Sequence, residues 1–448
     1  MPTAVGDRRQ IVAWYAAFAA LAAGVFAASG QPVQWIWGIW AAGGYALAAL
    51  AAALWRSRGR EAAVLIALAG AVAAPLAWQV TFGRRMSTVG ESSLAVVARA
   101  GLLLVHHGTP YLPSARISHV LQYNPYEPAM AIFGLPAALG LHGAAGNPRL
   151  WMGITAAAVI AAAFRRARPG SALRSTAFAV GSPVIALPLV TGLTDLPVLA
   201  LLSLTLACTA ARLDRRAALA GAIALGVACA IKATAWPALP IIAALLAARD
   251  GVRVAAKFVV TAVVTMAALV AATASAAATS PGALFQNTVL FPLGLTRYQS
   301  QAASPLPGHL LAVTGSSGRW AAIGLLGFVS LAMVASLVVR PPADAMAAAW
   351  RLAANLGLLF ALAPASRWGY FVYPAALLGF AGLTRRLAAE DHHALPAAIV
   401  GGTRLAGRGR RTSARGQLPC ASAYLVSSRC EAPTGTCCRS VAPACAAS

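Results

Sequence analysis

Long runs of apolar residues separated by short clusters of arginine dominate this sequence. Most runs are close to the length of about 20 residues that a helix needs to cross the hydrocarbon core of a bilayer. Of the 448 residues, 59% are hydrophobic and only 10% are charged, whereas a water-soluble domain carries about 25% charged residues. We therefore expect an all-α, polytopic integral membrane protein.

Twelve of these runs are candidates for transmembrane helices. Arginine clusters lie at alternate boundaries between the runs, and the positive-inside rule places such clusters in the cytoplasm. Twelve spans with both termini in the cytoplasm satisfy this rule, so the net charge of +24 needs no nucleic-acid partner. The predicted spans cover residues 11–29, 34–54, 62–82, 149–165, 172–190, 196–212, 216–232, 235–248, 255–278, 319–339, 345–363 and 368–385.

Two stretches decide this topology. The run 128–142 must not cross the membrane, which agrees with its short length and its internal glycines and proline. Residues 83–148 then form one large external loop, with surface helices predicted at 92–106 and 129–141. The second stretch, 216–248, is either two short helices or one kinked helix, and the positions of the later arginine clusters favour two helices.

The predicted topology divides the chain into three regions. Residues 1–61 hold two N-terminal transmembrane helices, and residues 62–386 form the transmembrane core. Residues 387–448 lose the long apolar runs and gain Arg, Ser, Pro and Cys. We expect this tail to be disordered and cytoplasmic.

Only three acidic residues fall on the external side of the membrane in this topology: Glu91, Glu127 and Asp195. Glu91 begins the first surface helix, where the helix N-terminus favours the carboxylate and keeps it able to accept a proton. Asp195 is either a polar contact for a substrate hydroxyl or an ordinary acid at a helix start. Glu127 is more typical of a loop or cap residue, with a substrate contact as the alternative.

Basic residues on the external side run against the positive-inside rule and are therefore candidates for binding an anion. Lys232 is the sharpest candidate because it ends an apolar helix at a break, where a cation needs a partner such as a lipid phosphate. The alternative is that its side chain extends to the membrane interface. The arginines in the same class are Arg84, Arg85, Arg297 and Arg367.

Several families of motifs are missing from the chain. It has no Walker loop, no GxSxG elbow and no cluster of His and Cys with metal-ligand spacing. We therefore expect neither a dedicated metal site nor a cofactor.

The order of several short motifs resembles that of the C-type (GT-C) membrane glycosyltransferases, and most closely the bacterial glycosyltransferase family 87 group. The resemblance covers residues 62–385. The matching pieces are the acid Glu91, then His107-Gly108-Thr109-Pro110-Tyr111, Tyr123-Asn124-Pro125-Tyr126-Glu127-Pro128, Gly192-Leu193-Thr194-Asp195 and Ile231-Lys232-Ala233-Thr234.

The resemblance implies a catalytic cavity at the outer face of a bacterial plasma membrane. It implies a polyprenyl-phosphate-linked sugar, often mannose, as donor, and a cell-envelope glycan or glycolipid is the natural acceptor there. Glu91 would act as general base in an inverting, metal-independent transfer. The chain departs from the family in two ways, since an aspartate is usual at the position of Glu91 and two extra helices precede the loop.

The resemblance also suggests roles for the polar residues of the predicted site. Lys232 and the external arginines would stabilise the phosphate charge that develops as the sugar leaves. Asp195 and Asn124 would orient hydroxyl groups. The remaining expected substrate contacts are His107, Tyr111, Tyr126, Glu127 and Tyr370.

Two other functions stay open on the sequence. A transporter or lipid flippase also carries charges and broken helices, but such proteins show internal repeats, and we find no similarity between the two halves. A non-catalytic membrane scaffold would leave Glu91, Asp195 and Lys232 scattered and individually dispensable.

Overall fold

The computed structural model describes residues 8–55, 59–82, 89–210, 214–275 and 281–385, with side chains omitted at 89–92. This part of the chain is built from helices and loops, and a single parallel bridge joins Ala303 to Ser366. The predicted tail, residues 387–448, lies outside the described residues.

Seven of the described helical stretches are long and apolar enough to cross a membrane. If the bent pair η6–α8 (Pro169–Val180) and α9 (Pro183–Thr191), which meet at 55°, is one span, there are eight. The seven are α1 (Arg8–Ala28), α2 (Pro32–Leu54), the stretch Gly59–Phe82 made of α3, η1 and α4, α7 (Pro148–Ala167), α13 (Val252–Thr273), α16 (Ser316–Val339) and α17 (Ala345–Leu362).

The other predicted spans are shorter helices. α10 (Leu196–Thr209), α11 (Arg215–Ile231) and α12 (Ala238–Arg249) occupy three of them, and residues 372–385 occupy the last. All twelve apolar runs are thus helical over most of their length. The chain is a multi-pass membrane protein, while the exact number of twelve crossings stays a prediction.

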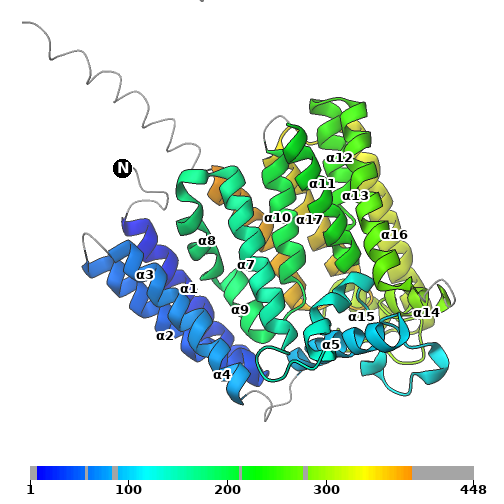
Figure 1. Ribbon diagram of the computed structural model, residues 1–448, viewed down its shortest axis with the longest axis horizontal. Coiled ribbons are helices and arrows are strands. Elements are labelled where there is room, and N and C mark those ends of the chain that lie inside the picture. The colour runs from blue at the N-terminus through cyan, green and yellow to red at the C-terminus, as the bar shows by residue number, and fades with distance from the viewer. Residues whose placement is uncertain (1–7, 56–58, 83–88, 211–213, 276–280, 386–448) are drawn as a thin grey trace, which may run out of the picture. The chain divides into compact units, whose positions relative to one another are not determined.

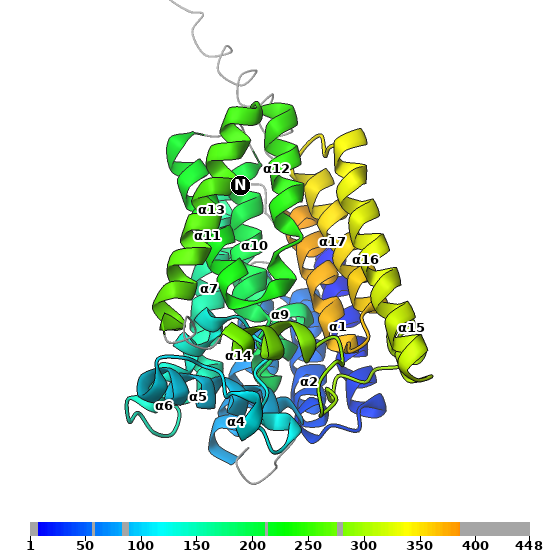
Figure 2. The same cartoon turned by 90° about the vertical axis from the view of Figure 1, so that its right-hand side faces the viewer.

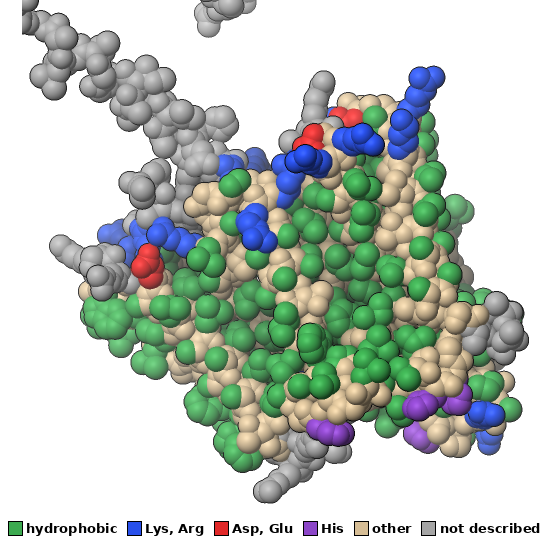
Figure 3. Space-filling model, viewed as in Figure 1, with side chains coloured by type: hydrophobic (Ala, Val, Ile, Leu, Met, Phe, Trp, Pro, Cys, Tyr) green, Lys and Arg blue, Asp and Glu red, His purple; other side chains and the backbone are tan. Residues whose placement is uncertain are grey.

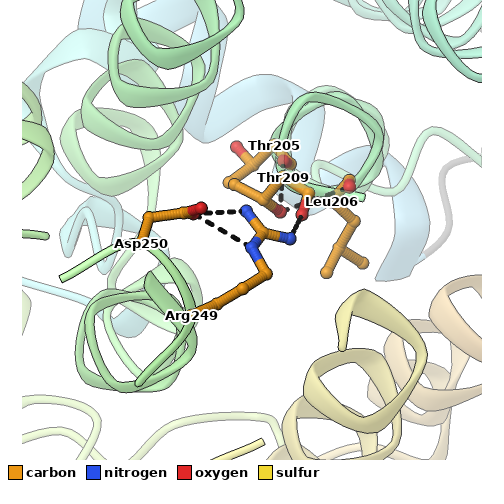
Figure 4. Close-up of polar contacts among 5 residues, drawn as sticks. All are labelled: Thr205, Leu206, Thr209, Arg249 and Asp250. Carbon is orange, nitrogen blue, oxygen red and sulfur yellow. Dashed lines mark hydrogen bonds and ion pairs between the residues drawn. The ribbon is translucent and has the colours of Figure 1, made fainter. Parts of the chain in front are cut away.

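Arg249 shows how the helices of the second uncertain stretch are arranged (Figure 4). Its Nη1 donates a hydrogen bond of 2.7 Å to the carbonyl oxygen of Thr209, the last residue of α10, while Nε and Nη2 bind Asp250 Oδ2 at 2.9 and 2.7 Å. α11 starts six residues after Thr209, and α12 ends at Arg249. The end of α12 thus returns to the end of α10, close in the chain to the start of α11. Residues 215–249 are therefore two antiparallel helices rather than one kinked helix, as the arginine pattern favoured.

Arginine and lysine side chains gather at one end of the helices, which we call the arginine-rich end (Figure 3). Acidic side chains lie among them there, and two ion pairs form between helices: Arg174 with Glu61 at 3.1 Å and Arg166 with Asp214 at 3.5 Å. Each of these four side chains is at least one third exposed, so these pairs add little stability.

The opposite end, which we call the α5 end, holds most of the non-spanning structure (Figures 1 and 2). α5 (Val89–His107) lies across the ends of the other helices and corresponds to the surface helix predicted at 92–106. The second surface helix, predicted at 129–141, corresponds to the short apolar helical stretch Pro128–Ala138. A 3-10 helix, η5 (Pro128–Gly134), is followed by the four-residue α6 (Leu135–Ala138), and Gly140 with φ 89° ends the segment.

Close backbone contact fixes α5 on η5. Gly101 of α5 meets Gly134 of η5, and a methyl group at Gly134 would overlap the carbonyl oxygen of Val97. The largest buried cluster continues from this crossing into α10, α11, α12, α17 and residues 372–385. The position of α5 therefore depends on two glycines that have no room for a side chain.

We predict that Gly134→Ala lowers the free energy of unfolding by about 1–3 kcal/mol, because the added methyl group forces two backbones apart. Thermal unfolding in detergent micelles measures the loss. Gly24→Ala is the matched control, since Gly24 of α1 has no atom within 4 Å of the new methyl group. Equal unfolding temperatures for the two variants would contradict the close crossing.

Candidate functional site

A buried ion pair joins α10 to α11 at the α5 end. Asp195 immediately precedes α10, and Lys232 immediately follows α11. The Lys232 ammonium group contacts Asp195 Oδ1, and the two residues are 7% and 1% exposed. Burial of a charge is costly unless an opposite charge compensates it, so each of these residues requires the other. Two residues predicted as separate substrate contacts are therefore direct partners.

Local backbone geometry brings the two charges together. α9 ends at Thr191, and the next residue, Gly192, has φ 77°, a left-handed conformation that favours glycine. A β-carbon there would also meet Leu94 of α5 and Nε of Arg149. This tight turn starts α10 at once and places Asp195 at its N-terminus. Lys232 takes an extended conformation, φ −159°, which ends α11 and directs the chain into the short 3-10 helix η7 (Ala233–Ala235) that precedes α12.

Three tyrosines surround the ion pair. The Lys232 ammonium lies 5.5 Å from the ring centre of Tyr126 and 5.1 Å from that of Tyr370, within the range of a cation–π contact. Thr234 donates a hydrogen bond of 2.8 Å to the Tyr373 hydroxyl, which bonds in turn to Asp195. Tyr126 and Tyr370 were predicted from the sequence, whereas Tyr373 was missed because it lies within an apolar run.

A network of hydrogen bonds holds the loop that carries Tyr126. The Tyr111 hydroxyl donates to the Tyr126 carbonyl oxygen at 2.8 Å. Asn124 Nδ2 donates to the Pro110 carbonyl at 3.3 Å, and its backbone N–H donates to Asn287 Oδ1 at 2.8 Å. The observed contacts of Tyr111 and Asn124 are thus with this loop and with Asn287, and they place the Tyr126 ring against Lys232.

Glu127 follows Tyr126 and is only 8% exposed. Burial disfavours its ionised form and raises the pKa of this carboxyl from 4.5 to about 7. Its charge also lies close enough to Tyr111 to raise the pKa of that hydroxyl further. Glu127 therefore changes its charge near neutral pH, next to the loop that contacts the ion pair.

The other predicted residues are only partly placed. Glu91 lies in the first turn of α5, but its side chain is outside the described residues, as are Arg84 and Arg85. His107, in the last turn of α5, is exposed, and so is Arg297, whose guanidinium lies 5.3 Å from the Tyr298 ring centre.

Arg367 is half-buried and lies near the Tyr370 hydroxyl, which also faces Lys232. The structure therefore brings Asp195, Lys232, Tyr126, Tyr370 and Arg367 into one neighbourhood.

A cavity of about 430 Å³ lies at the same end of the helices. α4, the loop before α7 and one face of α5 enclose it, the last through Leu94, Ala95 and Ala98. Gln79 and Arg149, which are 4% and 2% exposed, supply buried polar groups to its wall. Neither residue was predicted from the sequence, although a polar residue within or next to an apolar run was the available signal.

The described side chains form no group of three His, Cys, Asp or Glu residues that could hold a metal ion. The polar side chains at the α5 end carry carboxyl, ammonium, guanidinium, amide and phenol groups. Such groups bind sugar hydroxyls and oxyanions and move protons.

The model for glycosyltransferase family 87 matches residues 124–364, just over half of the chain. This stretch includes η5, α7 to α17 and both members of the ion pair. No curated protein matches the chain significantly.

Two solved structures of ArnT from Cupriavidus metallidurans are similar to this chain. The apo structure has 17% sequence identity and a TM-score of 0.43, with 69% of this chain and 57% of ArnT covered. The structure bound to undecaprenyl phosphate has 18% identity and a TM-score of 0.44, with 77% and 64% covered. The chain thus spans about three fifths of the length of the solved structures that it matches.

We predict that Lys232→Met lowers the free energy of unfolding by about 3–5 kcal/mol, because it leaves the buried Asp195 carboxylate without its partner. Replacing both residues, as Lys232→Met with Asp195→Leu, should restore much of the loss. Lys257→Met is the control, since Lys257 is exposed. Denaturant or thermal unfolding in micelles reports all three, and an unchanged Lys232→Met variant would rule out the pair as a structural unit.

Glu127 should make stability depend on pH. Its pKa is about 7 in the folded chain and near 4.5 when unfolded, so between these values the folded chain binds more protons. The contribution of Glu127 to the free energy of unfolding is therefore fully present below about pH 4.5 and is lost as the pH rises to about 7. Glu127→Gln should flatten this part of the profile and raise the unfolding temperature at pH 8. Unfolding curves from pH 4.5 to 8 measure the slope, and a slope that persists in Glu127→Gln would exclude this carboxyl as its source.

Proposed function

The chain belongs to glycosyltransferase family 87, of the GT-C type, and from this membership we propose that it moves a sugar from a polyprenyl-phosphate donor to a cell-envelope acceptor. We propose a mannose-type hexose as the sugar, and the outer face of a bacterial plasma membrane as the site of transfer. The observation that carries the proposal is the family match, which includes Asp195, Lys232, Tyr126 and Glu127.

The position of the polar residues supports chemistry at a membrane surface. Asp195 and Lys232 lie at helix ends rather than in the middle of spans, and α5 and η5 cover the same end. A transport pathway instead needs polar groups along the crossing itself. The arginine-rich end faces the cytoplasm by the positive-inside rule, so the α5 end faces outward in this proposal.

In the proposed reaction the acceptor hydroxyl oxygen attacks the anomeric carbon of the donor sugar. The new carbon–oxygen bond forms as the bond to the phosphate oxygen breaks, which inverts the anomeric centre. Glu91 takes the proton of the acceptor hydroxyl, and the polyprenyl phosphate leaves with the bonding electron pair. Three residues of α5 that line the cavity, Leu94, Ala95 and Ala98, follow position 91 by three, four and seven residues. This spacing is typical of residues on one helix face.

Basic groups at the α5 end compensate the charge of the departing phosphate in this proposal. Lys232 and Arg367 lie near the Tyr370 hydroxyl, with Arg84, Arg85 and Arg297 as further candidates from the sequence. Asp195, held by Lys232, and Asn124 would orient hydroxyl groups of the sugar or acceptor. Phosphate is a good leaving group, so the proposed step uses neither a metal nor a cofactor.

We predict that Glu91→Gln reduces transfer by at least about 100-fold, because the amide cannot accept the proton. The unfolding temperature should stay unchanged, since the replacement keeps the size of the side chain. Transfer is measured as incorporation of labelled mannose from polyprenyl-phosphate mannose into lipid or glycan products of membranes that contain the chain.

Glu61→Gln provides the matched control, because Glu61 is an exposed acid at the arginine-rich end. Near-normal transfer by Glu91→Gln would remove Glu91 from the mechanism. Movement of the labelled lipid across vesicles without any new covalent product would instead identify a flippase.

A further inference from the structure

A cavity of about 760 Å³ lies between α1 and the helices of the core, and we call it the α1 cavity. Its walls come from α1, α7, the bent pair α8 and α9, α10 and residues 375–383. The N-terminal helices stand as a group beside α8 and α9 (Figure 1), so the cavity lies where this group meets the core. None of the residues used in the proposed reaction lines it.

The wall of the α1 cavity is apolar over most of its length. No described residue that lines it is charged. Ser182 and Ser203 line it, but their hydroxyl groups already donate to the carbonyl oxygens of Ala179 and Leu199, at 2.6 and 2.9 Å. Gln10 adds an amide at the start of α1, which is the arginine-rich end. The wall therefore suits an apolar chain whose polar end lies at the arginine-rich end.

The α1 cavity extends about as deep as one leaflet of a membrane. Gln10, Trp14 and Phe18 line it from every fourth position of α1, so they lie on one helix face. The eight residues from the first to the last rise about 12 Å, and half of the hydrocarbon core is roughly 15 Å thick. Phe164 and Leu383 line the cavity close to the ends of their own helices on the same side. This depth matches the acyl chains of the leaflet at the arginine-rich end.

Aromatic rings form two walls of the α1 cavity. On the side of α1 and α8, the ring centres of Trp14 and Phe18 are 5.8 Å apart and those of Phe18 and Phe178 are 6.0 Å apart. On the side of α7, the rings of Phe164 and Phe380 are 5.1 Å apart. Water does not fill an apolar cavity, whereas a hydrocarbon chain from the surrounding lipid would gain contacts with both walls.

Three arginines lie at the mouth of the α1 cavity. Arg9, Arg165 and Arg385 are each within two residues of a residue that lines it, and all three are exposed. Among the described side chains, none of the three forms an ion pair with an acidic residue. Basic groups between helices at the membrane surface attract anionic lipid headgroups. The mouth of the cavity therefore complements a negative charge.

We propose that the α1 cavity binds a phospholipid with an anionic headgroup from the leaflet at the arginine-rich end. Its acyl chain lies between the two aromatic walls, and its headgroup lies beside Arg9, Arg165 and Arg385. The bound lipid thereby joins the N-terminal helices to the core. The phosphate of the sugar donor belongs to the opposite, α5 end in the proposed reaction, so the two sites take their lipids from different leaflets.

Competition for a labelled phosphatidylglycerol tests this proposal. The purified full chain in neutral detergent micelles is loaded with the labelled lipid, and the retained label is counted after addition of an unlabelled competitor. The competitors are phosphatidylglycerol, phosphatidylcholine with the same acyl chains, and undecaprenyl phosphate. We expect phosphatidylglycerol to displace the label at concentrations about fivefold or more below those of the other two, because the arginines favour its charge and the depth of the cavity favours its chains.

Filling the cavity should remove the lipid. Gly379 lines the cavity, and a β-carbon added there has no other atom within 4 Å. Leucine also favours a helix more than glycine does, so Gly379→Leu should fold. We expect it to weaken retention about tenfold or more, because the new side chain takes the space of the acyl chain. Gly382→Leu is a second variant with the same properties. Gly327→Leu, at an exposed and equally open position of α16, is the matched control.

The headgroup preference is tested with paired charge variants. Arg9→Gln with Arg165→Gln should bring phosphatidylglycerol and phosphatidylcholine to nearly equal affinity, because the attraction for the anionic headgroup is weakened. Arg253→Gln with Arg340→Gln removes two exposed arginines from α13 and α16 and should keep the preference of the wild type.

Three outcomes would overturn the proposal. They are equal retention by Gly379→Leu, Gly382→Leu and the Gly327→Leu control, equal competition by phosphatidylcholine against the wild type, and displacement by undecaprenyl phosphate, which would assign the cavity to the donor chain. The measurement needs no transfer activity. The lipid site and the proposed transferase function can therefore fail separately.

Discussion

The absence of water from the hydrocarbon core of a membrane determines how this chain is organised. A backbone N–H or carbonyl group in that region must find its partner within the protein, and a helix is the simplest way to satisfy all of them. Irregular segments and charged side chains are thereby directed to the ends of the helices. The α5 end collects α5, η5, the Tyr111–Pro128 loop and the turn at Gly192. Polar chemistry is possible there because irregular backbone is tolerated there.

The two ends of the helices use their charges differently. At the arginine-rich end the ion pairs between helices are at least one third exposed, and the arginines are the basis of the topology that the positive-inside rule predicts. At the α5 end Asp195 and Lys232 are buried, and each compensates the charge of the other. The same residue classes thus serve topology at one end and local structure at the other.

The helices and their order could be read from the sequence, because apolar runs of spanning length leave few alternatives. The division of residues 216–248 into two helices was predicted from the later arginine clusters. The structure confirms it, since α12 returns to the end of α10 through the Arg249–Thr209 hydrogen bond. The surface helix predicted at 129–141 is present at Pro128–Ala138, but most of it is a 3-10 helix, which the apolar run did not indicate.

Contacts between residues that lie far apart in the chain could not be predicted from the sequence. Asp195 and Lys232 are 37 positions apart, and nothing in either local pattern indicates that one neutralises the other. Gln79 and Arg149 were not predicted, because the predicted site residues come from the loops and turns between spans, whereas these two lie near the ends of spans. Tyr373 was not predicted either, because it lies within the apolar run 368–385. A single sequence gives the class of each side chain, but the packing of helices decides which of them meet.

The buried ion pair has a consequence for how the protein enters the membrane. Asp195 stands at the start of α10 and Lys232 at the end of α11, so each helix alone would bring one uncompensated charge into a lipid environment. Together the two helices form a unit in which these charges cancel. We therefore expect α10 and α11 to enter the lipid together as a hairpin during synthesis. In this order α10 leaves the translocon only after Lys232 has been synthesised.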